Sequence, residues 1–433
     1  MLVPGRAAHL ALTVAVAAAA LVGCDSQRET ADSATITVWD YYGSSTPIKP
    51  AISAFETAHP GITVRHVEKE YDDVLAAFGP DSARGAGPDV ATLDLTWLSS
   101  MADKGLLADL DDVSGGKING RDIEHVYSST ALDAMTYRNR YVAAPFDFDT
   151  YALYYRADLL KTQKIDVPDT WAELRDAARK LAAAADESGQ KGKWRVQIAP
   201  DTSHFAQLLF QDGGALLDGS GRKAVFAGPA GVRALTAYRD LLSDGGIYWG
   251  PEKGDSTGMD AIKDDRIAMF IRGPYMTGVL KDGVPDQSGK WGVAQVPALG
   301  TPGAERAGYL GGTALGIPQA STSKKAAWKF VQFTLRMEQQ RGVMDQAGAA
   351  PTTNEAILSL ELADVDPFFG DQTPQLVFLD ALSAGRPMPR IKQWAQVDAL
   401  INKAVQDTLQ GKRSPEAALA EAAAETDKIL ASP

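Results

Sequence analysis

The chain has 433 residues, of which 45% are hydrophobic and 23% are charged, and its formal net charge is −12. This length exceeds one compact hydrophobic core and predicts two domains, and the composition excludes an intrinsically disordered chain. Nucleic-acid binding is excluded as well, because that function needs a basic stripe and this acidic chain contains none.

The first 23 residues form a segment of their own. Arg6 is followed by an apolar stretch, LALTVAVAAAALV, which leads into LVGC at residues 21–24. The stretch is shorter than the roughly 20 residues of a membrane-spanning helix and ends in small residues, so it indicates an export signal. LVGC resembles the bacterial lipobox. We therefore expect Cys24, the only cysteine, to be a lipid attachment site rather than a buried thiol, with residues 24–34 as a flexible tether.

Strand and helix patterns alternate after the tether. We predict strands at residues 34–40, at 62–67 and within 87–95. A helix opened by Thr46 and Pro47 ends at the HPG sequence of residues 59–61, and another runs through Trp97 and Met101. This βαβα order favours a parallel α/β sheet.

The same kind of pattern restarts near residue 150. We predict strands at 151–155, 266–271 and 291–297, a helix capped near Asp169, and a return of residues 313–318 to the first sheet. The rest is largely helical, including 324–335 and the alanine-rich tail from Pro415. Two α/β lobes with crossings near 145–150 and 305–312 would leave a cleft, and ligands of open α/β sheets bind outside the carboxyl ends of the strands.

Several stretches together resemble one known family. The stretches are ITVWDYYG, FETAHPGITV, PDVATLDLTWLSSMADKGLLADL, YVAAPFDFDTYALYYRADLL, VPDTWAEL, RIAMFIRGPY, VPALGTPG, GYLGGTALGIP and RPMPRIKQWAQVDALI. Their order and spacing are similar to the carbohydrate-type extracellular solute-binding proteins (family 1) of bacterial ABC importers, such as maltose- and trehalose-binding lipoproteins. The resemblance implies a two-lobe periplasmic-binding-protein-like α/β fold with hinge strands. We assign 35–146 and 308–352 to the first lobe and 147–307 and 353–433 to the second.

Two carboxylates in PFDFDTYALYY are the leading candidates for sugar binding. Asp147 and Asp149 alternate with Phe146 and Phe148, so on a strand both carboxylates face one side. An ionised carboxylate accepts from two adjacent hydroxyls, and such bonds are about twice as strong as neutral ones. Asp147 is the stronger candidate, because Asp149 could instead cap a turn or the following strand.

Other candidates follow the predicted ends of strands, where polar or aromatic side chains, or bare backbone, could meet a sugar. They are Tyr41, Tyr42, Asp94, Trp97, Trp249, Glu252, Arg272, Tyr275, Gly311 and Gly312. Each has a structural alternative: the tyrosines and Trp97 as core residues, Asp94 as a helix N-cap, and the glycine pair as a hinge turn.

The sequence evidence for an enzyme is weaker than the evidence for a binding protein. GDSTG at 254–258 fits the G-x-S-x-G pattern, but a predicted loop precedes it where a serine hydrolase needs a strand. Two carboxylates at i and i+2 of one strand seldom flank a glycosidic bond, which argues against a glycosidase. DLDDVSGGKING at 109–120 fails as a calcium loop, and the five histidines show no metal-binding spacing. We expect no enzyme activity, no metal and no cofactor.

These observations predict a lipid-anchored substrate-binding protein on the extracytoplasmic face of the cell membrane. It would capture a mono- to oligosaccharide between its lobes and deliver it to the permease of an ABC importer, whose ATPase is a separate chain. The alternative is a receptor for another solute, such as a glycerophosphodiester or a peptide. We expect a monomer, although the sequence carries no signal for or against oligomerisation.

Overall fold

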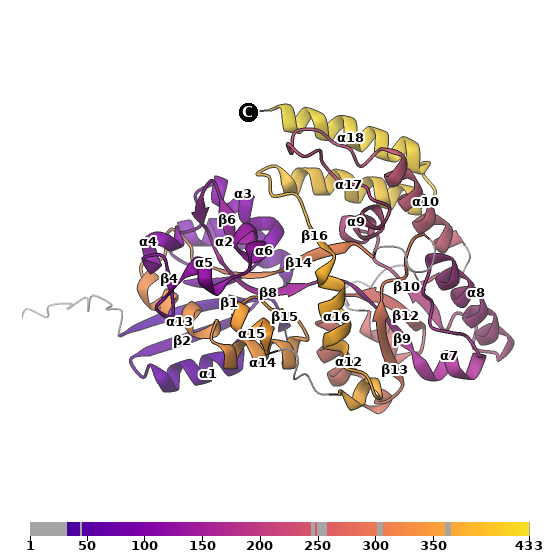
Figure 1. Cartoon of the computed structure of the whole chain (residues 1–433), viewed down its shortest axis with the longest axis horizontal. Coiled ribbons are helices and arrows are strands. Elements are labelled where there is room, and N and C mark those ends of the chain that lie inside the picture. Colours follow the sequence, from indigo (N-terminus) through magenta and orange to yellow (C-terminus); the bar gives the residue numbers. More distant parts are fainter. Residues whose placement is uncertain are drawn as a thin grey trace, which may run out of the picture.

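The chain folds into two lobes, each built around its own β-sheet (Figure 1). The computed structural model describes residues 33–43, 46–243, 247–248, 258–300, 306–359 and 365–432. We call the elements around the seven-stranded sheet the first lobe and those around the five-stranded sheet the second lobe.

The first-lobe sheet combines a parallel part with strands that return from later in the chain. Its order is β15-β8-β14-β3-β1-β2, with β16 paired to β14. The parallel pairs β1–β2 and β1–β3 confirm the predicted βαβα start, whereas β14 runs antiparallel to β3 and β8. The strands are β1 (Ala34–Asp40), β2 (Ile62–Glu68), β3 (Val90–Asp94), β8 (Ala144–Asp149), β14 (Gly308–Gly316), β15 (Ala350–Pro351) and β16 (Gly385–Pro387).

Helices bury apolar side chains on both faces of this sheet. Ile48, Ile52 and Phe55 of α1 pack with Phe330 of α13 on one face, while Val74, Phe78 and Trp97 pack on the other. The first-lobe helices are α1 (Ile48–Ala58), α2 (Tyr71–Ala83), η2 (Leu95–Trp97), α3 (Leu98–Asp103), α4 (Leu110–Ser114), α5 (Ile123–Val126), α6 (Ser129–Met135), α13 (Lys324–Thr334), α14 (Met337–Ala347) and α15 (Asn354–Leu358). Two small hairpins, β4 (Lys117–Ile118) with β5 (Arg121–Asp122) and β6 (Thr136–Tyr137) with β7 (Arg140–Tyr141), complete it.

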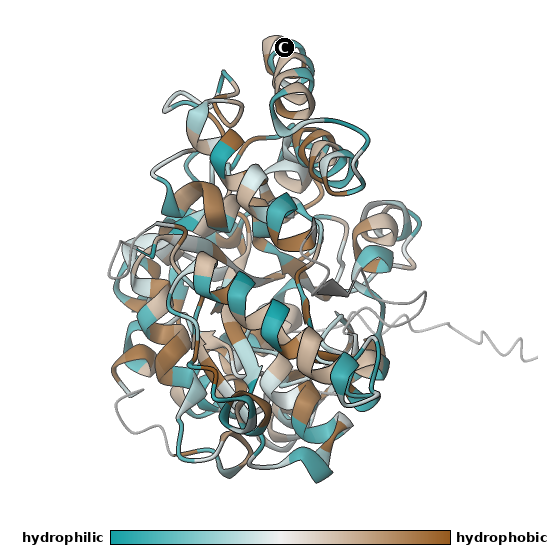
Figure 2. Ribbon diagram, turned by 90° about the vertical axis from the view of Figure 1, so that its right-hand side faces the viewer, coloured by the Kyte–Doolittle hydropathy of each residue, from teal (hydrophilic) through white to brown (hydrophobic). Residues whose placement is uncertain are grey.

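The second-lobe sheet has the order β11-β10-β12-β9-β13. Its strands are β9 (Ala152–Arg156), β10 (Arg195–Gln197), β11 (Ile247–Tyr248), β12 (Ile267–Arg272) and β13 (Trp291–Gln295). The helices are α7 (Ala157–Gln163), α8 (Trp171–Glu187), α9 (Thr202–Gln211), α10 (Pro229–Ser243), α11 (Met259–Lys263), α12 (Met276–Gly283), α16 (Pro374–Ser383), α17 (Trp394–Leu409) and α18 (Pro415–Ala431). Many helix ribbons in Figure 2 alternate between brown and teal, as expected of helices that bury one face.

The predicted start of α8 is confirmed in detail. Thr170 is the N-cap and forms a capping box with Glu173, and Trp171, Leu174, Ala178 and Leu181 are buried on one face. The N-terminus of α1 differs slightly from the prediction, because the helix begins at Ile48 and Pro47 is its N-cap. Thr46 still accepts a hydrogen bond from the Ile48 N–H, at 3.0 Å.

The chain passes between the sheets near Thr150. β8 belongs wholly to the first sheet and β9 wholly to the second, so the boundary that we placed between residues 146 and 147 falls inside β8. The boundary at 352/353 is also displaced, since α15 contacts α5, α14 and β15 of the first lobe. Strand pairing decides the first boundary, and the packing of α15 decides the second. β8 and β14 therefore place residues 147–149 and 308–312 at the junction of the lobes (Figure 1).

Candidate functional site

Asp147 is buried and its carboxylate is occupied by protein donors. The side chain is 2% exposed. Oδ1 accepts a hydrogen bond from the Thr313 N–H at 3.1 Å, and Oδ2 accepts one from the Tyr42 hydroxyl. Burial, followed by the charge of Asp149, raises the pKa of Asp147 well above its ordinary value. Asp147 thus connects the segment after β1, which carries Tyr42, with β14, which carries Thr313.

Asp149 stands two residues further along the same strand with an unused acceptor. Its Oδ1 atom is buried and has no hydrogen-bond partner. A Cβ atom on Gly273 would lie 3.6 Å from Asp149 Oδ2, so the turn after β12 reaches this carboxylate from the second lobe. Burial, together with the charge of Asp94, raises the pKa of Asp149 from 3.8 to about 7. Asp149, rather than Asp147, is therefore the carboxylate that keeps an unused hydrogen-bond acceptor.

Gly311 and Gly312 lie inside β14, not in a hinge turn, because this strand begins five residues before the predicted one. Gly312 has φ +141°, and a Cβ atom there would overlap the Asp147 carbonyl oxygen. A Cβ atom on Gly311 would overlap the Tyr309 hydroxyl and lie 2.5 Å from Asp149 Oδ1. The glycines permit the close approach of β8 and β14. That their N–H groups meet a sugar hydroxyl stays a prediction.

An aromatic cluster lies at the ends of the first-lobe strands. Tyr41 contacts Tyr42, Tyr71 and Trp97, with ring centroids 5.5, 5.3 and 6.0 Å away. Tyr71 is 42% exposed, whereas Trp97 is 8% exposed and packs in the core. The Tyr41 hydroxyl shares a hydrogen bond with Thr313 Oγ1 at 2.8 Å. Tyr71, the first residue of α2, carries no signal in the sequence that marks it as part of this cluster.

Asp94 is the N-cap that the sequence offered as its structural alternative, and its role in ligand binding stays a prediction. It is the N-cap of η2, accepting hydrogen bonds from the N–H and the hydroxyl of Thr96 at 2.7 and 2.6 Å. It also accepts a hydrogen bond from the Tyr71 hydroxyl at 2.9 Å. Burial raises the pKa of Asp94. Asp94 therefore has protein donors on both oxygens and places its charge beside the aromatic cluster.

The second lobe contributes a buried cation and several rings. Arg272 ends β12, is 7% exposed, and its Nε atom has no hydrogen-bond partner. Tyr275 follows as the N-cap of α12. Tyr151 stacks between His204 and Tyr309, with centroid distances of 4.3 and 5.1 Å. The stack connects α9 of the second lobe to β14 of the first. Tyr151 and Tyr309 lie within motifs that the sequence analysis quoted, but only the fold reveals their stacking.

We call five of these residues the interlobe group: Asp149, Tyr151, Arg272, Tyr275 and Tyr309. They come from β8, the crossing after it, β12, the start of α12 and β14. Burial and the charge of Asp149 raise the pKa values of Tyr151, Tyr275 and Tyr309, while Arg272 lowers those of Tyr151 and Tyr275. A hydroxyl-rich ligand would find a carboxylate, a guanidinium and aromatic rings here. Trp249, Glu252 and Cys24 lie outside the residues that the structure describes.

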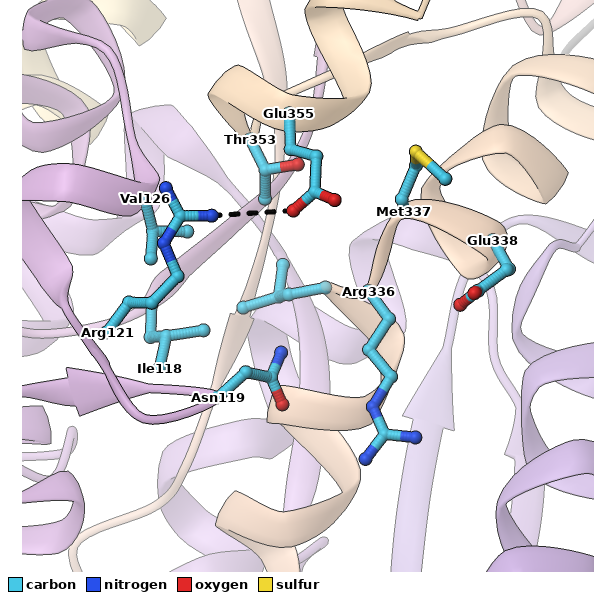
Figure 3. Close-up of a pocket in the computed structure, with 10 residues that line it drawn as sticks. Ile118, Asn119, Arg121, Val126, Arg336, Met337, Glu338, Thr353 and Glu355 are labelled. Carbon is cyan, nitrogen blue, oxygen red and sulfur yellow. Dashed lines mark hydrogen bonds and ion pairs between the residues drawn. The ribbon is translucent and has the colours of Figure 1, made fainter.

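A separate cavity of about 540 Å³ opens on the first lobe (Figure 3). Arg121 approaches Glu355 across it, at 3.4 Å. None of the predicted ligand-binding residues lines it, and it lacks aromatic rings for sugar stacking; the lining residues are Ile118, Asn119, Arg121, Val126, Leu335, Arg336, Met337, Glu338, Thr353 and Glu355. A second, much smaller cavity of about 10 Å³ touches Thr150, Tyr151 and Gly308. The interlobe group is therefore the candidate ligand site because of its unused hydrogen-bonding atoms and its aromatic rings, and not because of the size of a cavity.

Two further features bear on function. Among the described residues, no group of three or more His, Cys, Asp or Glu side chains is arranged to hold a metal ion. Nor does any helix within the described ranges combine the length and apolar character required to cross a membrane.

Comparison with known proteins gives one family and a consistent set of relatives. Residues 50–367 match the model of the bacterial extracellular solute-binding protein family. The lactose-binding protein of Rhizobium radiobacter is 25% identical over 86% of each chain. A maltooligosaccharide ABC transporter solute-binding lipoprotein of Streptococcus pneumoniae is 27% identical, covering 79% of this chain and 80% of its own.

Solved structures agree on the fold. The GacH receptor of Streptomyces glaucescens, solved unliganded and with acarbose, superposes with a TM-score of 0.79 at 24% identity, covering 92% of this chain and 99% of its own. A solute-binding protein of Thermotoga lettingae bound to α-D-tagatose gives a TM-score of 0.78 at 25% identity, covering 92% and 100%. The family match spans most of the chain and the two-lobe fold is shared with these receptors. As the sequence resemblance predicted, the chain belongs to the bacterial extracellular solute-binding proteins of ABC importers.

Proposed function

We propose that this protein is a lipid-anchored receptor that binds a carbohydrate between its lobes and delivers it to the permease of an ABC importer. The observation that carries the proposal is the interlobe group. It brings the unpartnered Oδ1 of Asp149 and the unpartnered Nε of Arg272 together with aromatic rings from both lobes. Carboxylate acceptors, guanidinium donors and ring faces complement the hydroxyls and C–H faces of a sugar. The names of relatives, which include lactose-binding and maltooligosaccharide-binding proteins, support the same class.

The mechanism follows from the two crossings between the sheets. Asp149 lies on the first lobe and Arg272 on the second, so one ligand can contact both only when the lobes are close together. A ligand with that differential contact shifts the population towards the closed state. We expect a micromolar dissociation constant, which corresponds to about −8 kcal/mol. No catalytic step is proposed.

Calorimetry tests the proposal directly. Protein beginning after Cys24 would be titrated with mono-, di- and trisaccharides and with a glycerophosphodiester, and the recovered sugar would be assayed for turnover. Saturable heat with a sugar and full recovery are expected. Heat from the phosphodiester alone would replace carbohydrate by the alternative solute, and consumption of the sugar would contradict the non-enzymatic role.

The lipid anchor has its own test. Cys24 follows the LVGC motif, and a lipoprotein relative is known in Streptococcus pneumoniae. In the full-length chain, Cys24→Ser is expected to move the protein from the membrane fraction to the medium, because the thiol that accepts diacylglycerol is lost. Unchanged membrane association of this variant would contradict lipid attachment at Cys24.

A further inference from the structure

Three carboxylates of the first lobe lie close enough to influence one another. The charge of Asp94 raises the pKa of Asp149, and the charge of Asp149 raises that of Asp147. Among the described residues, no ion pair includes Asp94, Asp147 or Asp149; the ion pairs lie elsewhere on the lobes. The carboxylates of the first lobe therefore make an anionic region, while Arg272 carries a buried positive charge on the second-lobe side.

Asp149 differs from its two acidic neighbours in how its oxygens are used. Asp94 accepts from Thr96 and Tyr71, and Asp147 accepts from Tyr42 and Thr313. Asp149 Oδ1 accepts from no group, although it is buried. A buried acceptor without a donor costs free energy, and an ionised one costs more. Asp149 is thus the position where a ligand's donor, above all a charged donor, gains most.

The electrostatic influence of Arg272 falls on other groups of the site. Its charge lowers the pKa of Asp201, Tyr151 and Tyr275, whereas the shift of Asp149 is caused by burial and by Asp94. The titratable and charged groups packed around Asp149 come from several elements; they are Asp94 on β3, Asp147 on β8, Tyr309 on β14, Arg272 on β12, Tyr275 on α12, and Tyr41 and Tyr151 in the connecting segments.

Building on the proposed carbohydrate function, we infer that the ligand is an amino sugar whose protonated amine binds the Asp149 carboxylate. An ammonium group offers three donors and a positive charge, so it fills the unused acceptor and neutralises the anionic region at once. A neutral hydroxyl supplies a donor only. The acidic chain as a whole also favours the approach of a cation, because its net charge attracts ligands of opposite sign.

The inference predicts proton release on binding. Without ligand, Asp149 with a pKa of about 7 is partly protonated near neutral pH, and the ammonium selects the ionised carboxylate. Affinity for the amino sugar is expected to rise between about pH 6 and 7 and to fall again once the amine itself loses its proton. A neutral sugar is expected to release fewer protons, since its hydroxyls favour the ionised carboxylate less strongly than an ammonium group does.

Matched sugars provide the test on the protein that begins after Cys24. Glucosamine and galactosamine would be titrated at about pH 7, each beside its parent hexose and its N-acetyl derivative, in buffers of different ionisation enthalpy. We expect the amine to bind roughly 10- to 100-fold more tightly than both neutral forms, with release of a proton. In Asp149→Asn this preference and the proton release disappear. Asp176→Asn, which removes the same charge from the exposed face of α8, keeps both.

The outcomes separate this inference from the proposed function. If a parent hexose or an N-acetyl sugar binds as tightly as the amine, the charge inference is overturned while carbohydrate binding stands. If no sugar of any type binds, the carbohydrate function fails and the inference falls with it. An amine preference that survives in Asp149→Asn overturns the assignment of the amine to Asp149.

Discussion

Two aspartates of one strand, β8, have very different surroundings. Around Asp147 the hydrogen bonds are made within the protein. Tyr42 and Thr313 donate to the carboxylate, and Gly312 permits the close contact of β14 with the backbone of β8. Around Asp149, two residues further on, one oxygen is buried without a donor and the second lobe approaches through Gly273.

The contrast separates a carboxylate whose hydrogen bonds the fold has satisfied from one that keeps an unused acceptor. Both residues are aspartates on the same face of one strand, so the sequence pattern alone cannot distinguish them. Satisfied hydrogen bonds stabilise the folded chain, whereas an unsatisfied buried group is retained at a cost that a bound partner can remove. Substitutions at and near the two aspartates can therefore break or sharpen this contrast.

Among these substitutions, Gly312→Ala should lower the stability of the fold most, because it disturbs the surroundings of Asp147. The residue has φ +141°, and an added Cβ would overlap the Asp147 carbonyl oxygen, so we expect the free energy of unfolding to fall by about 3 kcal/mol or more. Urea denaturation measures the change. Gly342→Ala in α14, where an added Cβ has no atom within 4 Å, is the matched control and should be neutral or slightly stabilising. Equal stability of the two variants would contradict the role given to Gly312.

Asp147→Ala should also act on stability. The change leaves the Tyr42 hydroxyl and the Thr313 N–H without their acceptor, and we expect a loss of about 1–3 kcal/mol in the free energy of unfolding. Sugar affinity should fall by a similar amount, because the strands that position Asp149 are loosened. A variant that weakens binding at wild-type stability would instead place Asp147 in direct contact with the ligand.

Asp149→Ala should show the opposite pattern. Its carboxylate makes no hydrogen bond through Oδ1, so the free energy of unfolding measured in urea should be unchanged or slightly higher. Binding of the sugar identified by calorimetry should weaken by about 1–3 kcal/mol, since the ligand loses its acceptor. A large loss of stability without a change in affinity would reverse the roles assigned to the two aspartates.

The pH dependence of stability offers a smaller effect with a defined sign. The pKa of Asp149 is raised from 3.8 to about 7, so the folded chain binds more protons than the unfolded chain between these values. The free energy of unfolding of the unliganded protein should therefore decrease as the pH rises from about 4 to 7. Asp149→Asn should reduce this decrease by on the order of 1 kcal/mol. Asp398, whose pKa is raised to about 6 by burial, contributes in the same direction and remains in the variant.

The first-lobe cavity of Figure 3 provides the smallest expected effect. Arg121 and Glu355 are exposed and 3.4 Å apart, so Arg121→Ala should change stability by less than about 1 kcal/mol. Sugar affinity should not change, because this cavity contains no member of the interlobe group. An altered calorimetric titration would show that the cavity communicates with the site.

The two-lobe α/β class, the early βαβ order and the family can all be predicted from the amino-acid sequence. These follow from local periodicity, from helix-start signals such as the cap expected near Asp169, which the structure places at Thr170, and from motifs in a fixed order. The sequence also indicates PFDFDTYALYY as the leading candidate segment for ligand binding. Asp149 and Tyr151 of the interlobe group lie in that segment, and Asp147 is fixed beside them.

The difference in hydrogen bonding between Asp147 and Asp149 emerges only once the chain has folded. Whether Asp147 or Asp149 keeps a free acceptor depends on Thr313, which is 166 positions away from Asp147, and on Tyr42, which is 105 positions away. The exact crossing between lobes depends on strand pairing, and the aromatic contacts of Tyr71, Tyr151 and Tyr309 depend on how elements pack. Hydrogen bonds and burial are properties of neighbours in space, so a local pattern can indicate a carboxylate but not whether the folded chain has already satisfied it.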